Sequence, residues 1–232
     1  LVWGNTVEDP QLTGIYVDAW DKPTSAIRVF GNTIRSSLGG HGIALASEMG
    51  GRLADIQVFN NVAFLNRYCG CVVSVNGPGG PQGEHPMDGI YVENNTFVAN
   101  GQIDWGGGIA VDNPGATNVV LCNNICSSNF FFQMAVVPGA AAATRVERNL
   151  VNRFRGTENE VRGAPYVEAD PAFLDPAGGN YRLRFGSPCI DAGTNRAWMA
   201  GAQDVRGDSR IAGIAVDLGA GGCGNWTVAN VD

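Results

Sequence analysis

Charge is scarce in this sequence, and positive charge most of all. Only 16% of the 232 residues are charged, the formal net charge is −7, and Lys22 is the single lysine. An acidic chain offers no basic surface to a polyanion, so we expect no nucleic-acid partner. No apolar run approaches the roughly 20 residues that cross a bilayer, so we also expect no membrane partner.

Cysteine patterns typical of metal sites are missing as well. None of the six cysteines forms a C-x-x-C block, and the C-x-C of Cys69 and Cys71 is weak by itself. We therefore predict no metal site among them. We interpret the cysteines as a few disulfides and buried thiols, which favours a secreted, extracellular protein.

Glycine and asparagine are abundant instead. The chain has 33 glycines and 21 asparagines, and 44% of its residues are hydrophobic. This mixture favours many turns and short strands around a sizeable core.

An internal repeat runs through the first two thirds of the chain. "IRVFGN", "IQVFNN", "IYVENN", "VVLCNN" and "TRVERN" all alternate apolar residues and end on asparagine, and "VWGN" at the start is a truncated copy. A second series runs in step with it: "GIYVDA", "GIALAS", "GCVVSV", "GIAVDN" and "QMAVVP". The asparagines that end the first series are Asn5, Asn32, Asn61, Asn95, Asn124 and Asn149.

Two period-2 series at a common spacing of about 28 residues predict stacked turns with at least two strands each. A short third strand is expected after each asparagine, as in "NTIRSS" and "NTFVAN". The predicted fold is all-β: a right-handed parallel β-helix solenoid of about five or six coils over residues 1–155. The repeated asparagines are expected to stack their amides in an internal ladder.

Residues 156–232 are predicted to form a C-terminal capping segment. "VEADPAFLDPAGGNYRLRFGSPCIDAG" and "DVRGDSRIAGIAVDLGAG" resemble the C-terminal segment of secreted bacterial β-helix proteins, with its D-P-x-F, S-P-x-I-D-A-G and D-x-G-A motifs. We expect this segment to cover an open end of the solenoid, with Cys189 and Cys223 as a capping disulfide. Leu1 starts inside a coil, so a missing N-terminal region or a partner is expected to cover that edge.

The second series is expected to carry the functional face. Its apolar residues alternate inward, and the loops that leave it vary most, as in "AWDKPTSA" and "NGPGGPQGEHPMD". Asp18 faces outward on one coil, and Glu48 leaves the same strand one coil later. Strand spacings put their Cα atoms about 8 Å apart and their carboxyl groups about 5 to 9 Å apart, which covers both retaining and inverting glycoside hydrolysis. Asp21 is a second candidate partner for Glu48, and surface turn-capping is the alternative reading of these aspartates.

His41 begins the same strand, in the sequence G-H-G. This resembles the G-H-G of polygalacturonases, which are β-helical and carry a functional histidine there. The adjacent aspartate pair of those enzymes corresponds here to Thr13 and Gly14, which makes a polygalacturonase improbable. His41 is a candidate substrate hydrogen-bonding group or proton carrier, and loop packing is the alternative.

Lys22 suggests a second chemistry. A uronate lyase needs a base for the proton next to the carboxylate, and Ca²⁺ or arginine to neutralise that carboxylate. Lys22 with Arg52, and Ca²⁺ on Asp18 or Asp21, would supply these groups, although no cofactor is required for hydrolysis. A surface ion pair between Lys22 and Asp21, with no catalytic role, is the alternative.

Further polar and aromatic residues fall on or near this face. Glu84, His85 and Asp88 form a second polar cluster in the longest loop. Tyr16, Trp20 and Trp105 lie on or near this face, where aromatic rings suit stacking on sugars, and core packing is the alternative for Trp105. The remaining candidate substrate-binding residues are Tyr16, Trp20, Arg52, Ser74, Asn76, His85 and Asp112.

The whole chain resembles right-handed β-helix proteins, among which pectinases, lyases and some xylosidases are found. That resemblance implies an extracellular carbohydrate-active enzyme, with a polysaccharide or oligosaccharide as partner. Glycoside hydrolysis is the first hypothesis and polysaccharide lyase the second. A non-catalytic carbohydrate-binding or cell-surface module is the third.

Overall fold

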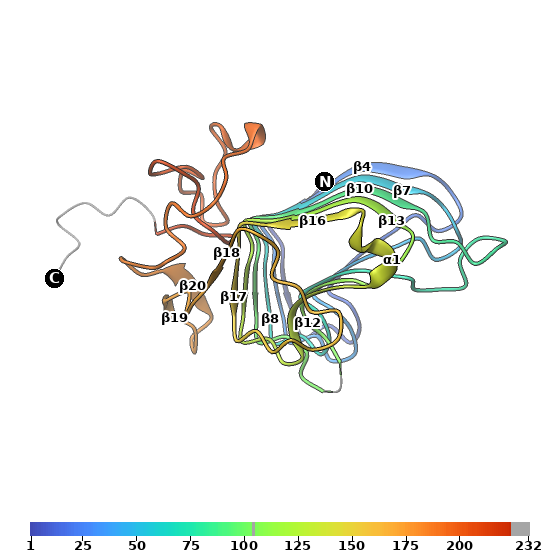
Figure 1. The fold of residues 1–232 in the computed structure, drawn as a ribbon, viewed down its shortest axis with the longest axis horizontal. Coiled ribbons are helices and arrows are strands. Elements are labelled where there is room, and N and C mark those ends of the chain that lie inside the picture. The colour runs from blue at the N-terminus through green and yellow to red at the C-terminus, as the bar shows by residue number, and fades with distance from the viewer. Residues whose placement is uncertain (104, 224–232) are drawn as a thin grey trace.

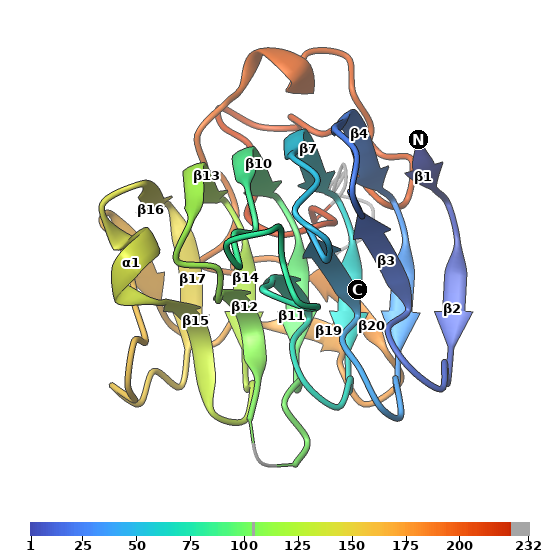
Figure 2. The same ribbon diagram turned by 90° about the vertical axis from the view of Figure 1, so that its right-hand side faces the viewer.

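The chain winds into a solenoid of about five turns, built from three stacks of parallel strands. The computed structural model describes residues 1–103 and 105–223. Figure 1 looks along the stack, so that successive strands of one sheet overlap, and Figure 2 shows the same strands side by side. This confirms the predicted all-β parallel solenoid.

Each predicted series forms one sheet. Sheet A holds the first series, sheet B the short strands that follow each asparagine, and sheet C the second series. Sheet A comprises β1 (Val2–Trp3), β4 (Thr24–Phe30), β7 (Leu53–Phe59), β10 (Met87–Glu93), β13 (Ala116–Cys122) and β16 (Thr144–Glu147). Sheet B comprises β2 (Thr6–Glu8), β5 (Thr33–Arg35), β8 (Val62–Phe64), β11 (Thr96–Val98), β14 (Ile125–Ser127), β17 (Asn149–Asn152) and β18 (Tyr166–Glu168). Sheet C comprises β3 (Ile15–Asp18), β6 (Ile43–Ala46), β9 (Cys71–Val73), β12 (Gly107–Val111) and β15 (Phe132–Val136).

The asparagine ladder forms as predicted. In each rung the side-chain Nδ2 donates to the Oδ1 of the asparagine one coil later, at 2.8 to 3.0 Å. A second ladder, which the sequence analysis missed, lies at the turn between sheets B and C. It joins Asn66 to Asn100, Asn129 and Gln133.

The core lies between the three sheets. Strand alternation predicts two inward-pointing residues on each strand of sheet C, and all ten are buried and pack against sheet A residues such as Ile56 and Ile90. Alternation also predicts an outward-facing row of Tyr16, Ala44, Val72, Ala110 and Ala135, but only Tyr16 of this row is exposed. The other four belong to a separate buried cluster that also contains Cys69 and Phe132.

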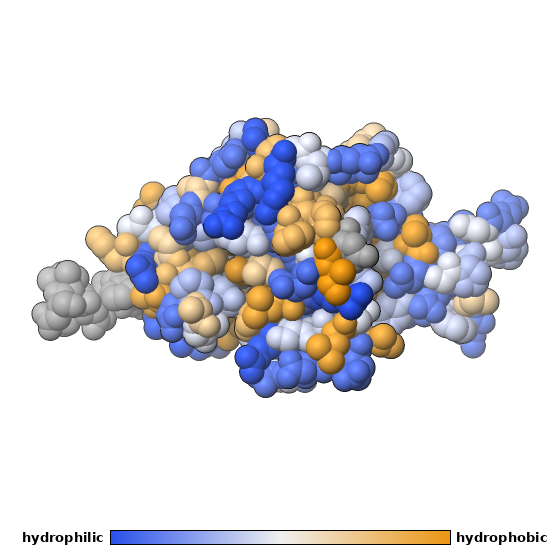
Figure 3. All heavy atoms as spheres, turned by 90° about the horizontal axis from the view of Figure 1, so that it is seen from below, coloured by the Kyte–Doolittle hydropathy of each residue, from blue (hydrophilic) through white to orange (hydrophobic). Residues whose placement is uncertain are grey.

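The turns between sheets B and C lie at the bottom of Figure 1. Seen from below, this face mixes hydrophobic and hydrophilic patches (Figure 3). The large exposed hydrophobic residues of these turns are Leu12, Leu38, Leu65, Ile103, Trp105 and Phe130.

The segment after β18 lies along the side of the solenoid, beside the corner of sheets A and B (Figure 1). It contains the hairpin of β19 (Phe173–Asp175) and β20 (Asn180–Leu183) and a 3₁₀ turn over Ala197–Met199. The sequence analysis expected it over an open end, but it crosses three successive coils. The reason is that three ladder residues are each preceded by an asparagine that has a positive φ and donates to this segment. These bonds run from Asn60, Asn94 and Asn123 to the carbonyls of Gln203, Asp217 and Thr194.

The prediction of a disulfide in the segment after β18 is wrong. Cys189 is a buried free thiol and does not pair with Cys223. Burial raises the pKa of the Cys189 thiol to about 12, so it stays protonated and packs as a small apolar group. The other buried free thiols are Cys69, Cys71, Cys122 and Cys126.

Candidate functional site on the outer face of sheet C

The structure brings Asp18 and Glu48 together on one face. Asp18 ends β3 and pairs in register with Ala46 of β6, and Glu48 follows two residues later. The backbone N–H of Glu48 donates to Asp18 Oδ1 at 3.0 Å. Both carboxylates therefore open onto the same outer side of the solenoid, one coil apart.

Tyr16 connects to this pair. Its hydroxyl donates a short hydrogen bond to Glu48 Oε1, and Asn76 also hydrogen-bonds to the Tyr16 side chain. Burial and the bond to Glu48 raise the Tyr16 pKa. The phenol is therefore protonated near neutral pH and holds one oxygen of Glu48 in place.

The loop over residues 74–86 fastens to the site, and it extends outward beyond the sheets in Figure 1. Gly79 donates its N–H to the Glu48 carbonyl at 2.7 Å, and the Asn76 N–H bonds to Ser74 Oγ at 3.1 Å. Gly77 has φ +83°, and a Cβ there would lie 2.6 Å from the Glu48 carbonyl oxygen. Only glycine permits so close an approach.

His85 belongs to the same loop but binds backbone. Its Nδ1 lies 2.8 Å from the Ser47 carbonyl oxygen, and its own carbonyl accepts from Asn113 Nδ2 at 2.8 Å. His85 therefore anchors the loop that carries Asn76, rather than facing the carboxylates.

The loop after β3 adds an exposed aromatic ring. Trp20 is 54% exposed, and its carbonyl accepts the N–H groups of Met49 and Gly51, which joins this loop to the one that carries Glu48. Asp21 and Lys22 are exposed, and neither side chain forms an ion pair within residues 1–103 and 105–223.

Ser74 and Asp112 continue the column of Asp18 along the sheet. The Ser74 N–H donates to the Leu45 carbonyl, so Ser74 lies beside Ala46 one coil later. The Asp112 N–H donates to the Val73 carbonyl, so Asp112 lies beside Ser74 on the following coil. Burial raises the Asp112 pKa. The neighbouring small residues form a hollow of about 210 Å³ over β12 and β15, which Trp105 borders.

His41 lies at the opposite end of β6 from Glu48. Its Nδ1 accepts the Cys69 N–H at 3.1 Å, and its ring packs near Tyr68 and Trp105. Burial lowers the His41 pKa to about 4, so the ring is neutral near pH 7. These contacts match the packing alternative and leave no proton to donate at Nδ1.

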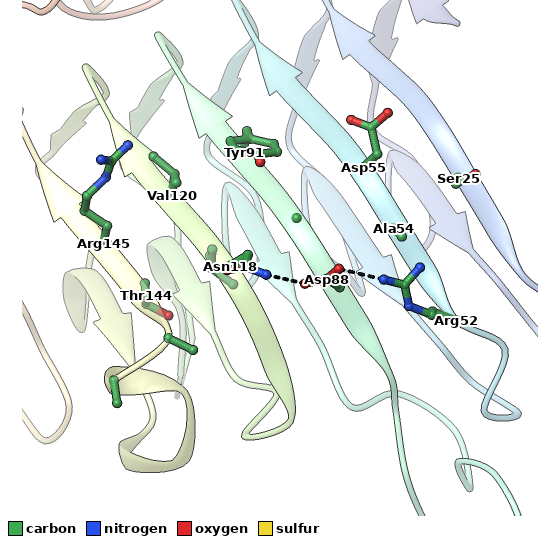
Figure 4. Close-up of a pocket in the computed structure, with 14 residues that line it drawn as sticks. Ser25, Arg52, Ala54, Asp55, Asp88, Tyr91, Asn118, Val120, Thr144 and Arg145 are labelled. Carbon is green, nitrogen blue, oxygen red and sulfur yellow. Dashed lines mark hydrogen bonds and ion pairs between the residues drawn. The ribbon is translucent and has the colours of Figure 1, made fainter.

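Arg52 turns toward a different surface. Its guanidinium pairs with Asp88 at 2.6 Å, and both residues line a groove on the outer face of sheet A (Figure 4). Asp88 therefore belongs to that groove, although it follows Glu84 and His85 closely in sequence.

No helix of residues 1–103 and 105–223 is long and apolar enough to span a membrane. Over the same residues, no three His, Cys, Asp or Glu side chains are grouped as a metal site would require.

Sequence reasoning found Asp18, Glu48, Tyr16 and Asn76, but it assigned Tyr16 to sugar stacking and overlooked Gly77. The glycine-rich run "NGPGGPQG" was the available signal, since close backbone approach requires glycine. No protein-family model matches the chain, and no curated protein matches it either.

Proposed function

We propose that this protein is a glycoside hydrolase that uses Asp18 and Glu48 on the outer face of sheet C. The observation that carries the proposal is that the Glu48 N–H donates to Asp18 Oδ1 from one coil later, while Tyr16 bonds to one oxygen of the Glu48 carboxylate. Two adjacent carboxylates are the usual machinery of glycosidic bond cleavage.

The hydrogen bonds of the two carboxylates support such a role. Asp18 uses Oδ1 to hold the Glu48 N–H, and Glu48 uses Oε1 to accept from Tyr16. Each carboxyl group therefore keeps one oxygen for the substrate. One protonates the leaving glycosidic oxygen, while the other attacks the anomeric carbon or activates the water that is added across the bond.

Trp20 and Asn76 supply substrate contacts in this proposal. Trp20 offers an exposed ring face for stacking on a sugar, and the Asn76 amide both donates and accepts hydrogen bonds. The resemblance to right-handed β-helix proteins that act on polysaccharides supports the same substrate class. Because polysaccharides lie outside the cell, secretion is part of the proposal.

The test is a screen of plant and bacterial polysaccharides for new reducing ends. The wild type is expected to release them, with or without a chelator, and Glu48→Gln is expected to lower the rate by about 10²–10⁴-fold. Glu84→Gln is the matched control, because Glu84 is an exposed carboxylate of the neighbouring loop, and its rate should be unchanged.

Three outcomes would overturn the proposal. Unsaturated products that disappear in Lys22→Ala would indicate a lyase. Saturable binding without turnover would indicate a binding module. Equal rates in the wild type and Glu48→Gln would remove Glu48 from the chemistry.

A further inference from the structure

A backbone irregularity recurs on four consecutive strands of sheet A. Ala26, Asp55, Gly89 and Asn118 occupy one register position on β4, β7, β10 and β13, and all have φ between 51° and 67°. Non-glycine residues rarely adopt this conformation, and such outliers concentrate at functional sites. Four in a row on one face form a continuous structural feature.

The irregularity changes which side chains face outward. On β10, Met87 and Ile90 are buried, whereas Asp88 and Tyr91 are partly exposed on either side of Gly89. Because every strand carries the left-handed residue at the same position, the pairing stays in register, and the side chains before and after this residue no longer follow simple alternation. As a result, polar and aromatic side chains gather on this part of the sheet.

These side chains border a groove of about 870 Å³ (Figure 4). The residues just after α1 (Pro138–Ala141) line one side of it, namely Ala142, Ala143 and Thr144. Gly89 lies in the middle and contributes no side chain. A Cβ built there would have only ordinary contacts, 3.6 Å from Asp55 N and 3.8 Å from Tyr91 Cε2.

Asp88 is the polar centre of the groove. It accepts from Arg52 at 2.6 Å, from Asn118 Nδ2 at 2.6 Å and from Thr117 Oγ1 at 2.8 Å. The bonds from Asn118 and Thr117, more than Arg52, lower the Asp88 pKa. Asp88 is therefore charged at neutral pH, and it keeps Arg52 and Asn118 in fixed positions.

The lining balances its charges. Arg52 and Arg145 oppose Asp55 and Asp88, so the formal charge of the lining is zero and no ionic ligand is favoured. Donors and acceptors lie beside the ring of Tyr91. Sugar hydroxyls both donate and accept, and sugar rings stack on aromatic faces, so this arrangement suits a neutral oligosaccharide.

We propose that the sheet A groove is a second, non-catalytic binding site for a neutral oligosaccharide segment. The site uses neither Asp18 nor Glu48, so it stands or falls independently of the hydrolase proposal. It would hold a polymeric carbohydrate on a face of the solenoid other than the one that carries the carboxylate pair.

The test measures binding of cellohexaose, xylohexaose and hexagalacturonate by calorimetry, using the full chain with Glu48→Gln to prevent turnover. We expect one neutral hexasaccharide to bind, and Gly89→Asn to weaken its binding at least tenfold by filling the floor of the groove. Asn118 adopts the same backbone conformation, so Gly89→Asn should keep its unfolding midpoint. Gly83→Asn is the matched control, because Gly83 also has a positive φ but faces open space, and its affinity should be unchanged.

Tyr91→Ala provides a second variant, and we expect it to weaken binding severalfold. The proposal is overturned if neither neutral sugar binds, if hexagalacturonate binds best, or if Gly89→Asn binds as tightly as Gly83→Asn. Binding that is lost in Tyr16→Phe, and kept in Gly89→Asn, would place the sugar on sheet C instead.

Discussion

The interior asparagine ladder and the outer carboxylate site both depend on the stacking of successive coils. They differ in which residues the stacking brings together. In the ladder, residues one coil apart are identical, and each amide completes the hydrogen bonds of the next. On sheet C, residues one coil apart differ, so that Asp18 lies beside the backbone of Glu48. Repetition stabilises the solenoid, and departures from repetition bring different side chains together.

The first prediction tests the interior side of this comparison. Asn95→Ala is expected to lower the free energy of unfolding by about 4 kcal/mol, because a fully buried amide that makes five hydrogen bonds is lost and its partners stay buried. Urea denaturation measures the change, with the exposed Asn76→Ala as control. A loss below about 1 kcal/mol would contradict the role of the ladder.

The second prediction tests how the outer site is held. Gly77→Ala is expected to cost about 2 kcal/mol and to lower hydrolysis, because the added methyl group collides with Glu48 and the φ is positive. Gly83→Ala has the same backbone strain without the collision. Equal activity in the two variants would show that the fit against Glu48 is unimportant.

The third prediction concerns acid sensitivity at the other end of sheet C. Burial lowers the His41 pKa to about 4, whereas an unfolded histidine titrates near 6.5. The stabilisation is therefore complete above about pH 6.5 and is lost as the pH falls toward 4. Between pH 7 and 4 the wild type should lose about 2 kcal/mol more stability than His41→Gln, which retains an acceptor for the Cys69 N–H. Parallel pH curves for the two proteins would contradict this.

The smallest expected change in stability concerns the segment after β18. The ring of Trp198 packs at a tilt against Phe59, with centroids 4.6 Å apart, and its Nε1–H donates to Glu93 at 3.1 Å. Arg196 also pairs with Glu93. Trp198→Phe keeps a ring over Phe59 and removes one hydrogen bond, so thermal unfolding should show a loss of about 1 kcal/mol. The exposed Trp20→Phe should be neutral. A loss well above 2 kcal/mol would mean that the packing of the Trp198 ring, more than its hydrogen bond to Glu93, holds the segment after β18 on the solenoid.

The stacked coils could be predicted well from the sequence, because each coil repeats the same alternation of apolar residues and the same terminal asparagine. The second ladder was within reach too, since Asn61, Asn95 and Asn124 are each followed by another asparagine five residues later. The buried state of Ala44 and Val72 was not predictable from alternation, because their cluster includes residues outside their own strands, such as Cys69 and Phe132.

It was harder to predict from the sequence which surface each polar side chain faces. Arg52 follows Glu48 by four residues, yet its guanidinium pairs with Asp88 on sheet A. Which way a loop side chain turns depends on its contacts, and strand alternation does not specify it. Likewise, the left-handed residues Asp55 and Asn118 interrupt the alternation without a glycine or proline to mark them.

Mass spectrometry of products formed in oxygen-18 water tests most directly whether Asp18 and Glu48 cleave a glycosidic bond. We expect saturated fragments that carry one labelled oxygen at the new reducing end from the wild type, and none from a folded Glu48→Gln variant. Unlabelled unsaturated fragments, or intact polysaccharide after incubation with every substrate of the screen, would contradict it.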